Sequence, residues 1–288
     1  MKIHVLPVAA KFQPTQQAFR YPGHNDAYDV EQDFLSYLKD HPDLIASVPE
    51  EADWSYLPIL WTRWHMAHDY AKQGRAELQA EVDRVLNGVT RAFTVCLYED
   101  GPLVNIGSTI LLTATRKPTT VNGVDIPTIC AMHPTFSIGK RYRASFVGRF
   151  HTNPVRQEMA AALAGRLDTF IRDGDFGQRT FVETILASDI ALCPSGGSGS
   201  FRFYEAMQLG VVPLLIHEID TRPFKRVIDW DSCSMHIQSA EGISEALDRF
   251  DAATLREMGR CAANVYRDCL AYQKWCGYAL QELECASV

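Results

Sequence analysis

The 288-residue sequence lacks any apolar run of the ~18 residues that a membrane-spanning helix needs, so we predict no membrane span. It also lacks the features of a secretory signal. The first residues, MKIHVLPVAAKF, contain one short apolar run that His4 and Pro7 interrupt, and no small-residue cleavage site follows. Such a stretch is typical of a first buried strand rather than a signal peptide. We therefore expect a cytoplasmic protein.

Basic residues are too few for a general nucleic-acid-binding surface. Lys and Arg total 28 against 35 Asp and Glu, which gives a formal net charge of −7 at pH 7. Proteins that coat nucleic acids or anionic membranes carry a basic footprint. The charge balance excludes both classes of partner, and any phosphate group must be bound by a local cluster of positive charge. The sequence does not determine the oligomeric state.

The sequence also lacks cysteine and histidine ligands at the spacing that is typical of a metal site. None of the eight cysteines forms a CxxC pair, so we expect reduced thiols rather than a zinc site. His65 and His68 stand three residues apart in a helical stretch, but no further ligands follow at a recognisable spacing. The patterns Asp173-Gly174-Asp175 and Asp229-Trp230-Asp231 resemble the metal-binding DxD motif, which is short enough to occur by chance. We predict no metal ion and no other cofactor.

The residues that are present have the composition of a globular protein, with 47% hydrophobic and 22% charged side chains. The length suggests two domains, each able to bury its own core. Strand-like runs alternate with helical patterns, as in βαβ units with a parallel sheet. We predict an α/β fold of two Rossmann-like domains, over residues 1–140 and 141–268, with a C-terminal helix over 269–288 that can cross back to the first domain.

The expected boundaries of the elements follow from apolar periodicity and turn residues. In the first half we expect helices over residues 28–41 and 64–86 and strands near residues 3–8, 54–60, 93–98, 108–113 and 128–132. In the second half we expect strands near residues 145–150, 169–172, 190–193 and 211–216, with helices after Asn153, over 180–187, over 201–209 and over 252–283.

The stretch from Ser188 to Ile216, SDIALCPSGGSGSFRFYEAMQLGVVPLLI, carries the clearest chemistry. It is a strand, a loop of small residues, a helix and a second strand. In a parallel α/β sheet, ligands bind beyond the carboxyl ends of the strands, where this loop lies. Glycines let backbone N–H groups approach an anion, serines add hydroxyl donors, and the helix dipole favours negative charge. The loop from Ser195 to Ser200 therefore predicts a phosphate site, with a merely flexible connection as the alternative.

The helix after this loop adds two candidate ligands. Apolar residues between Phe203 and Gly210 repeat at helical spacing and are expected to face the core. Arg202 and Glu205 then share a different face near the ligand. They can also form an intrahelical salt bridge, although Arg before Glu is the weaker order for it. A carboxylate one turn into such a helix is well placed to bind a ribose diol.

This stretch, together with Arg222 to Ile237 (RPFKRVIDWDSCSMHI), resembles the exostosin family of glycosyltransferases. The resemblance is strong from about Tyr142 to Ile237 and looser before that. The other stretches that share it are Ser145–Phe150 (SFVGRF) with Pro154-Val155-Arg156, Pro49–Pro58, the helix with Tyr28, Glu31 and Phe34, and Glu99-Asp100-Gly101.

The resemblance implies a GT-B architecture, in which two Rossmann-like domains face each other across a cleft. It also implies an inverting transfer from a nucleotide sugar, usually UDP-linked, to a glycan acceptor, without a catalytic metal. The sugars that it allows are xylose, galactose, arabinose, glucuronic acid and N-acetylglucosamine. By the same resemblance Glu205 binds the ribose and Arg149 reaches into the cleft. The residues implied for the diphosphate are Ser198, Gly199, Ser200 and Arg202. Many family members carry a membrane anchor, and animal members a second catalytic domain; we expect neither here.

An inverting transfer needs a general base to deprotonate the acceptor hydroxyl. Without a metal, Arg149, Arg202 and the helix N-terminus would stabilise the leaving diphosphate. We expect the base at a strand end of the first domain. Asp100 is the first candidate because it follows the strand near 93–98, although an aspartate before a glycine is also typical of a turn. The next candidates are Asp26 and His24, followed by Asp53 and His65.

Other functions also fit two Rossmann-like domains. An epimerase or a glycoside phosphorylase uses the same kind of domain, although no lysine motif for pyridoxal phosphate is evident here. A solute-binding protein closes two such domains on its ligand, but those proteins are exported. A non-catalytic nucleotide-sugar binder would keep Arg202 and Glu205 without transferring a sugar.

Overall fold

The computed structural model describes residues 1–15, 30–120, 122–130, 132–196 and 199–285. The chain forms two compact units, the first from Met1–Pro127 with Tyr272–Val288 and the second from Thr128–Ala271. The boundaries expected from the sequence lie at residues 140 and 268, whereas the units divide after Pro127 and after Ala271. The chain therefore enters the second unit once and returns to the first for its last helix.

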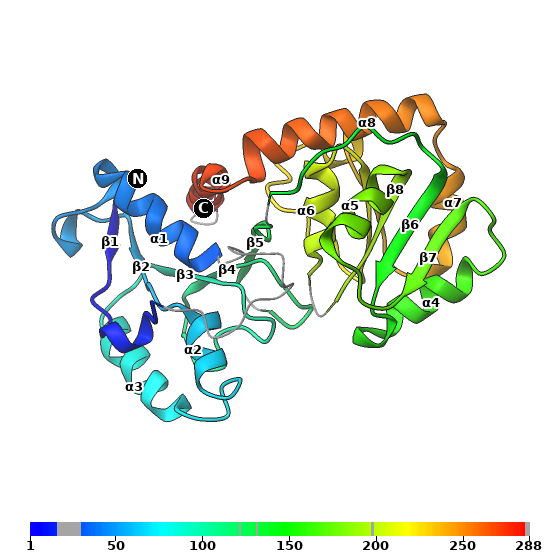
Figure 1. The fold of residues 1–288 in the computed structure, drawn as a ribbon. Coiled ribbons are helices and arrows are strands. Elements are labelled where there is room, and N and C mark those ends of the chain that lie inside the picture. The colour runs from blue at the N-terminus through cyan, green and yellow to red at the C-terminus, as the bar shows by residue number, and fades with distance from the viewer. Residues whose placement is uncertain (16–29, 121, 131, 197–198, 286–288) are drawn as a thin grey trace. The chain divides into compact units, whose positions relative to one another are not determined.

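A five-stranded parallel sheet in the order β1-β2-β3-β4-β5 forms the centre of the first unit (Figure 1). Helices α1 and α9 cover one face of this sheet, and α2 and α3 lie on the other (Figure 1). The elements are β1 (Ile3–Val5), α1 (Val30–Asp40), β2 (Trp54–Tyr56), α2 (Trp61–Ala67), α3 (Arg75–Leu86), β3 (Ala92–Cys96), β4 (Ile110–Thr113), β5 (Gly123–Asp125) and α9 (Lys274–Cys285).

Two apolar clusters hold the helices of the first unit to the two faces of its sheet. On one face the ring of Phe34 in α1 lies 5.1 Å from that of Tyr56 and 5.7 Å from that of Trp275 in α9. On the other face Leu78 and Val82 of α3 belong to a second buried cluster. Since successive strand residues point to opposite faces, short apolar strands supply both clusters.

Three expected elements are wrong. The helix expected over 252–283 is interrupted before α9, because Ala271 is extended and Gln273 has a φ angle of 58°. The helix expected over 64–86 is two helices, because Asp69, Tyr70 and Ala71 between them have φ angles of 52°, 55° and 59°, which a right-handed helix cannot accommodate. The strand expected at 128–132 is also wrong, since none of its described residues is in a strand. The fifth strand is instead β5, which pairs with β4.

A second five-stranded parallel sheet, in the order β10-β9-β8-β6-β7, forms the centre of the second unit (Figure 1). Helices α4, α7 and α8 share one core cluster on one face, and α5 and α6 pack on the other. The elements are β6 (Tyr142–Gly148), α4 (Pro154–Ala162), β7 (Thr169–Asp173), α5 (Gln178–Leu186), β8 (Ser188–Pro194), α6 (Phe201–Gln208), β9 (Val212–Ile216), β10 (Met235–Ile237), α7 (Ile243–Asp248), α8 (Ala252–Val265) and a π-helical turn (Tyr266–Leu270).

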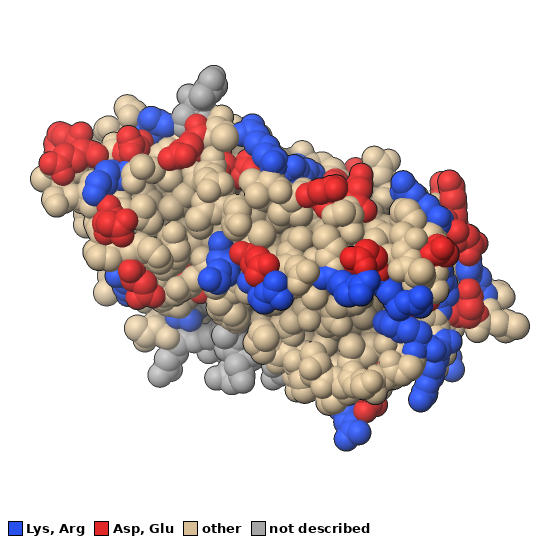
Figure 2. Space-filling model, turned by 90° about the horizontal axis from the view of Figure 1, so that it is seen from above, with Lys and Arg blue, Asp and Glu red and all other residues tan. Residues whose placement is uncertain are grey.

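Three further features of the described residues are the distribution of charge on one face, the state of the cysteines and the lengths of the apolar helices. On the face drawn in Figure 2, Lys and Arg side chains are interspersed with Asp and Glu among the described residues. All eight cysteines are free thiols, and five of them are buried. In the part of the chain that the structure describes, no helix has both the length and the apolar character needed to cross a membrane.

Candidate functional site

The second sheet has a switch point between β6 and β8, and this is where the candidate site is built. Strand β7 pairs with one edge of β6, while β8, β9 and β10 follow on the other side. Open α/β sheets bind ligands at such a reversal, beyond the carboxyl ends of the two strands. Because β6 ends at Gly148 and β8 at Pro194, Arg149 and Ser195 are the first residues beyond those ends.

The first residues of the loop after β8 are bound by polar groups from the start of α4. The Gly196 N–H donates to the Gly199 carbonyl at 3.1 Å. The Asn153 amide donates to the Gly196 carbonyl at 3.0 Å, and Arg156 Nε donates to the Ser195 carbonyl at 3.4 Å. Asn153 also caps α4, as the sequence predicts, so one residue orders both the helix and the loop.

The predicted diphosphate ligands lie at the start of α6. Ser200 is the N-cap residue of this helix, and Gly199 precedes it. Ser198 lies outside the described residues. The N-terminus of an eight-residue helix thus follows directly from the loop at the carboxyl end of β8. Its dipole and its first N–H groups favour an anion there.

Arg202 is held across the end of β6. Its guanidinium lies 4.1 Å from the centre of the Phe146 ring and 5.2 Å from that of Phe181. Its Nη2 donates to the Val147 carbonyl at 2.5 Å. A side chain at Gly148 would come within 3.1 Å of the same Nη2, so the absence of one leaves room for the arginine. The structure brings Arg202 to the switch point.

Arg149 lies at the same edge of the sheet in a two-point ion pair with Asp175. Its Nε and Nη2 donate to the two Asp175 oxygens at 2.5 and 2.7 Å. The hydrogen bond and charge of Arg149 hold the pKa of Asp175 below its usual range. Asp173 accepts the Phe150 N–H at 2.7 Å. Both carboxylates of the first DxD pattern therefore bind residues that follow β6.

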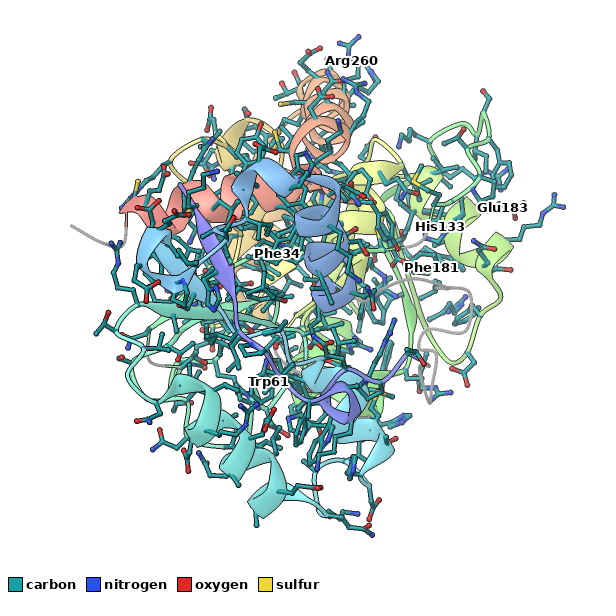
Figure 3. The ribbon with its side chains drawn as sticks, turned by 90° about the vertical axis from the view of Figure 1, so that its left-hand side faces the viewer. Phe34, Trp61, His133, Phe181, Glu183 and Arg260 are labelled. Carbon is teal, nitrogen blue, oxygen red and sulfur yellow. The ribbon has the colours of Figure 1, made fainter. Side chains whose placement is uncertain are left out.

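Glu205 is buried in contact with His133, a residue that the sequence analysis missed. His133 Nε2 lies 3.0 Å from Glu205 Oε1, and the two side chains are 0% and 3% exposed. The His133 N–H donates to Gln208 Oε1 at 2.7 Å, and its ring lies beside Phe181 (Figure 3). His133 is 72 residues from Glu205 in the sequence, and no local pattern connects the two.

The candidate bases belong to the first unit. Asp100 lies in a turn beyond β3, with its side chain 55% exposed, and accepts Lys117 Nζ at 2.6 Å. Asp26 and His24 lie outside the described residues. Asp53 accepts the backbone N–H of Lys2 at 2.7 Å, which gives it a structural contact near β1.

Two buried polar side chains lie near the carboxyl end of β3. His65 is fully buried with its ring 4.6 Å from that of Tyr98, and burial lowers the pKa of His65 to about 4. It is therefore neutral at pH 7. Glu31 is also fully buried, and its carboxylate accepts the Thr62 hydroxyl at 2.7 Å and the Leu97 N–H at 2.9 Å. Glu31 thus ties α1 to α2 and to the end of β3.

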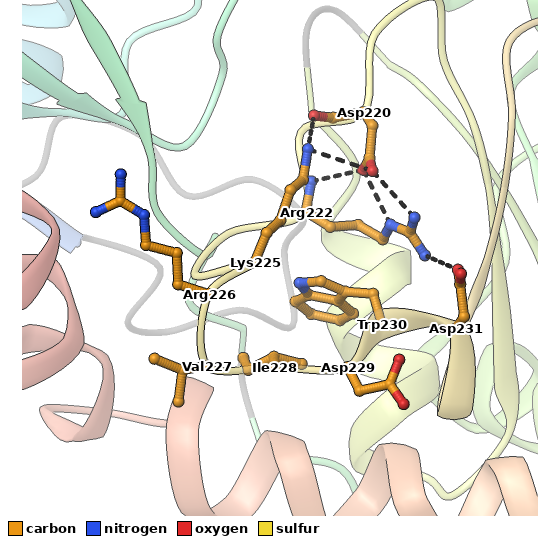
Figure 4. A pocket seen from close by; sticks show the side chains of 9 residues that line it. All are labelled: Asp220, Arg222, Lys225, Arg226, Val227, Ile228, Asp229, Trp230 and Asp231. Carbon is orange, nitrogen blue, oxygen red and sulfur yellow. Dashed lines mark hydrogen bonds and ion pairs between the residues drawn. The ribbon is translucent and has the colours of Figure 1, made fainter.

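An open pocket of about 460 Å³ lies along the segment that follows β9 (Figure 4). Arg222 donates from Nε and Nη2 to the two Asp220 oxygens at 2.9 and 3.0 Å, and Lys225 Nζ lies 3.2 Å from Asp220. Burial favours the neutral form of Asp220, but hydrogen bonds and charge from Arg222 outweigh it and hold its pKa well below the usual range. The residues that line the pocket are Asp220, Arg222, Lys225, Arg226, Val227, Ile228, Asp229, Trp230 and Asp231.

The fold and site together define a two-unit α/β protein with a glycine- and serine-containing loop at the switch point of its second Rossmann-like unit. The chain belongs to the exostosin GT47 family of glycosyltransferases, since residues 96–246, just over half of its length, match the exostosin GT47 domain. The predicted family and the predicted fold class, α/β with the two Rossmann-like units of GT-B enzymes, are confirmed.

The curated relative and the solved structures give the extent of the similarity. The chain is 34% identical over 99 residues to the Exostosin-1 homolog of Caenorhabditis elegans; the match covers 33% of this chain and about a quarter (26%) of that protein. It is similar to AviGT4, a glycosyltransferase involved in avilamycin A biosynthesis (12% identity, 98% of this chain and 97% of that one, TM-score 0.41). It is also similar to sucrose-phosphate synthase from Thermosynechococcus elongatus (11% identity, 88% and 76%, TM-score 0.45).

Proposed function

We propose that this glycosyltransferase moves a monosaccharide from a UDP-sugar to a hydroxyl group of a glycan acceptor, with inversion and without a metal ion or other cofactor. The observation that supports the proposal is the anion-binding geometry at the switch point of the second unit. There the loop after β8 leads into the N-terminus of α6, and the guanidinium of Arg202 reaches the end of the neighbouring strand β6. A diphosphate is a ligand of matching charge and size.

In this proposal the second unit binds the donor. Arg202 and the N-terminus of α6 stabilise the negative charge that develops on the diphosphate as the glycosidic bond breaks. Arg149 adds positive charge from the end of β6, and Glu205 binds the ribose. The loop residues proposed for the diphosphate are Ser195, Ser198, Gly199 and Ser200.

The first unit supplies the base. Asp100 takes the proton from the acceptor hydroxyl as its oxygen attacks the anomeric carbon. The new C–O bond forms on the face opposite the breaking bond, and UDP leaves with the electron pair, so the anomeric centre is inverted. Asp26 and His24 are the alternative bases. The proposal requires the two units to face each other across a cleft, as the GT-B architecture implies.

A thermal-shift titration of the whole chain with UDP, GDP, CMP and AMP tests the donor assignment. We expect UDP to raise the melting temperature most, because ligand that binds only the folded state stabilises it by mass action. If UDP has no effect while another nucleotide stabilises the protein, the UDP assignment is wrong. Product analysis with a UDP-sugar in the presence of EDTA then tests transfer without a divalent metal.

A further inference from the structure

Glu205 and His133 form a buried polar pair in the second unit. Their atoms Oε1 and Nε2 are 3.0 Å apart, and the two side chains are 3% and 0% exposed. A carboxylate removed from water needs such a partner, because burial without one costs several kcal/mol. The contact therefore constrains where the Glu205 carboxylate can point.

A third residue determines which nitrogen of the ring donates. Gln178 Nε2, at the start of α5, lies 3.2 Å from His133 Nδ1. With the amide in this orientation, Gln178 donates to Nδ1, so the proton of the neutral ring is on Nε2. That proton points at Glu205 Oε1. The three side chains thus form a chain of hydrogen bonds that ends on the carboxylate.

The backbone of His133 is tied to the same helix that carries Glu205. The His133 N–H donates to Gln208 Oε1 at 2.7 Å, and Gln208 is one turn after Glu205 in α6. The amide of Gln208 in turn donates to Tyr266 Oη at 3.2 Å. The imidazole is therefore held at both its ring and its backbone, and it fixes Glu205 relative to the helix N-terminus where the phosphate loop lies.

We propose that His133 is a positioning residue for Glu205 and that this pair makes the site prefer ribonucleotides to 2′-deoxyribonucleotides. The inference rests on the proposed function, because it needs Glu205 to meet the ribose of a bound nucleotide. With 3% of its surface exposed, Glu205 offers a ligand only a narrow edge, so its orientation decides which hydroxyl it accepts. A site built to hydrogen-bond a hydroxyl rejects the analogue that lacks it, because the buried group is then unpaired.

Calorimetric titration with UDP and 2′-deoxy-UDP tests this proposal on the whole chain. We expect the wild-type protein to bind UDP at least ~10-fold more tightly than the deoxy form. His133→Phe keeps an aromatic ring beside Phe181 but removes the donor. This variant should bind UDP about tenfold more weakly and 2′-deoxy-UDP less than about twofold more weakly. The preference for UDP over the deoxy form then nearly disappears. His133→Gln, whose amide can donate from a similar position, should retain most of the preference.

Four outcomes overturn the inference or separate it from the donor assignment. An unchanged preference in His133→Phe overturns it, and so does an equal loss for both nucleotides, which indicates a structural role alone. If the wild-type protein binds another nucleoside diphosphate instead of UDP, the UDP assignment fails, and the same ratio is measured with that nucleotide and its 2′-deoxy form. If it binds none, the proposed function and the inference both fail.

Gln178→Leu provides a second measurement if His133→Phe does not fold. Without the amide at Nδ1, the ring proton is free to occupy either nitrogen. We expect the preference for UDP to fall about threefold, because only part of the ring population then donates to Glu205. A preference equal to that of the wild-type protein contradicts the proposal.

Discussion

Arg202 illustrates how single residues of the site are held before any ligand arrives. Its guanidinium is stacked on Phe146 and bound to the Val147 carbonyl, so little side-chain freedom remains to be lost when an anion binds. Arg149 is similarly restrained by Asp175. At the scale of the residue, the two arginines that we propose for donor binding are therefore restrained by other residues of the second unit.

Asp100→Asn tests the catalytic base. The amide cannot accept the proton, so we expect transfer to fall by at least ~100-fold while UDP affinity is unchanged. The loss of the exposed pair with Lys117 should cost less than about 1 kcal/mol of stability, so unfolding would not explain the result. Lys117→Met is the matched control, because it removes the same pair and keeps the carboxylate. Retained turnover in Asp100→Asn would move the base to Asp26 or His24.

His65 predicts how stability depends on pH. Burial lowers its pKa from 6.5 to about 4, so between these values the unfolded chain binds a proton that the folded chain does not. The free energy of unfolding should therefore fall as the pH drops from about 6.5 to 4, by about 3 kcal/mol at most.

Urea denaturation at pH 7 and pH 5 measures this effect. At pH 5 the wild-type protein should have lost about 2 kcal/mol relative to pH 7, and His65→Phe should lose clearly less. The exposed His151, substituted as His151→Gln, is the control and should behave as the wild type. Equal pH dependence in wild type and His65→Phe would show that His65 does not carry the effect.

At the scale of the element, the placement of α6 depends on a close crossing with α8. Helix α6 is followed by Gly210, whose φ of 71° ends the helix, and α8 passes over this residue at Gly259. A Cβ at Gly259 would overlap the Gly210 carbonyl oxygen and lie 3.1 Å from its carbonyl carbon. The crossing thus fixes the C-terminal end of the helix whose N-terminus follows the loop after β8.

Gly259→Ala tests this crossing. Alanine normally stabilises a helix by up to about 1 kcal/mol relative to glycine, but here we expect a loss of more than about 2 kcal/mol, because two backbones would have to separate. Gly277→Ala in α9 is the matched control, since its Cβ would meet only Tyr37 Oη, at 3.8 Å. Chemical denaturation compares the two variants. If Gly259→Ala were as stable as the wild type, α8 would be able to move away from Gly210 without a loss in the free energy of unfolding.

Sequence reasoning succeeded for elements and residues whose position depends on local signals. Asn153 marks the start of α4, and the rule for parallel sheets places the loop from Ser195 beyond the carboxyl end of β8. It failed for His133, because a contact across 72 residues leaves no local pattern. It also failed at residues 69–71, where positive φ angles occur without glycine.

At the scale of the whole molecule, the last helix completes the first unit. The backbone N–H of Gln273 and the indole Nε1 of Trp275 both donate to Asp33 Oδ2 at 2.8 Å. Trp275 is fully buried against Phe34. These contacts hold α9 to α1, and they involve the first unit alone.

Asp33→Ala should therefore destabilise one unit and not the other. It leaves the Trp275 indole buried without its acceptor, so we expect a loss of about 2–4 kcal/mol in the unfolding transition of the first unit. UDP, which we propose binds the second unit, should raise the transition of that unit in both proteins. Calorimetry resolves the two transitions. Asp40→Ala is the control, because Asp40 is exposed and accepts only the Gln273 side chain at 3.1 Å. If Asp33→Ala shifted the unfolding temperatures of both units equally, the prediction that the two units have independent cores would be wrong.

The return of the chain to its first unit also determines an order of events during translation. Multidomain proteins usually fold from the N-terminus onward as they are synthesised. Here the last residue of the second unit, Ala271, is synthesised before α9, and the first unit is completed only when α9 has left the ribosome. Until then the nascent chain exposes the aromatic surface around Phe34 that Trp275 will cover. A chain released without the residues from Tyr272 onward would contain the whole second unit but would leave this surface of the first unit uncovered.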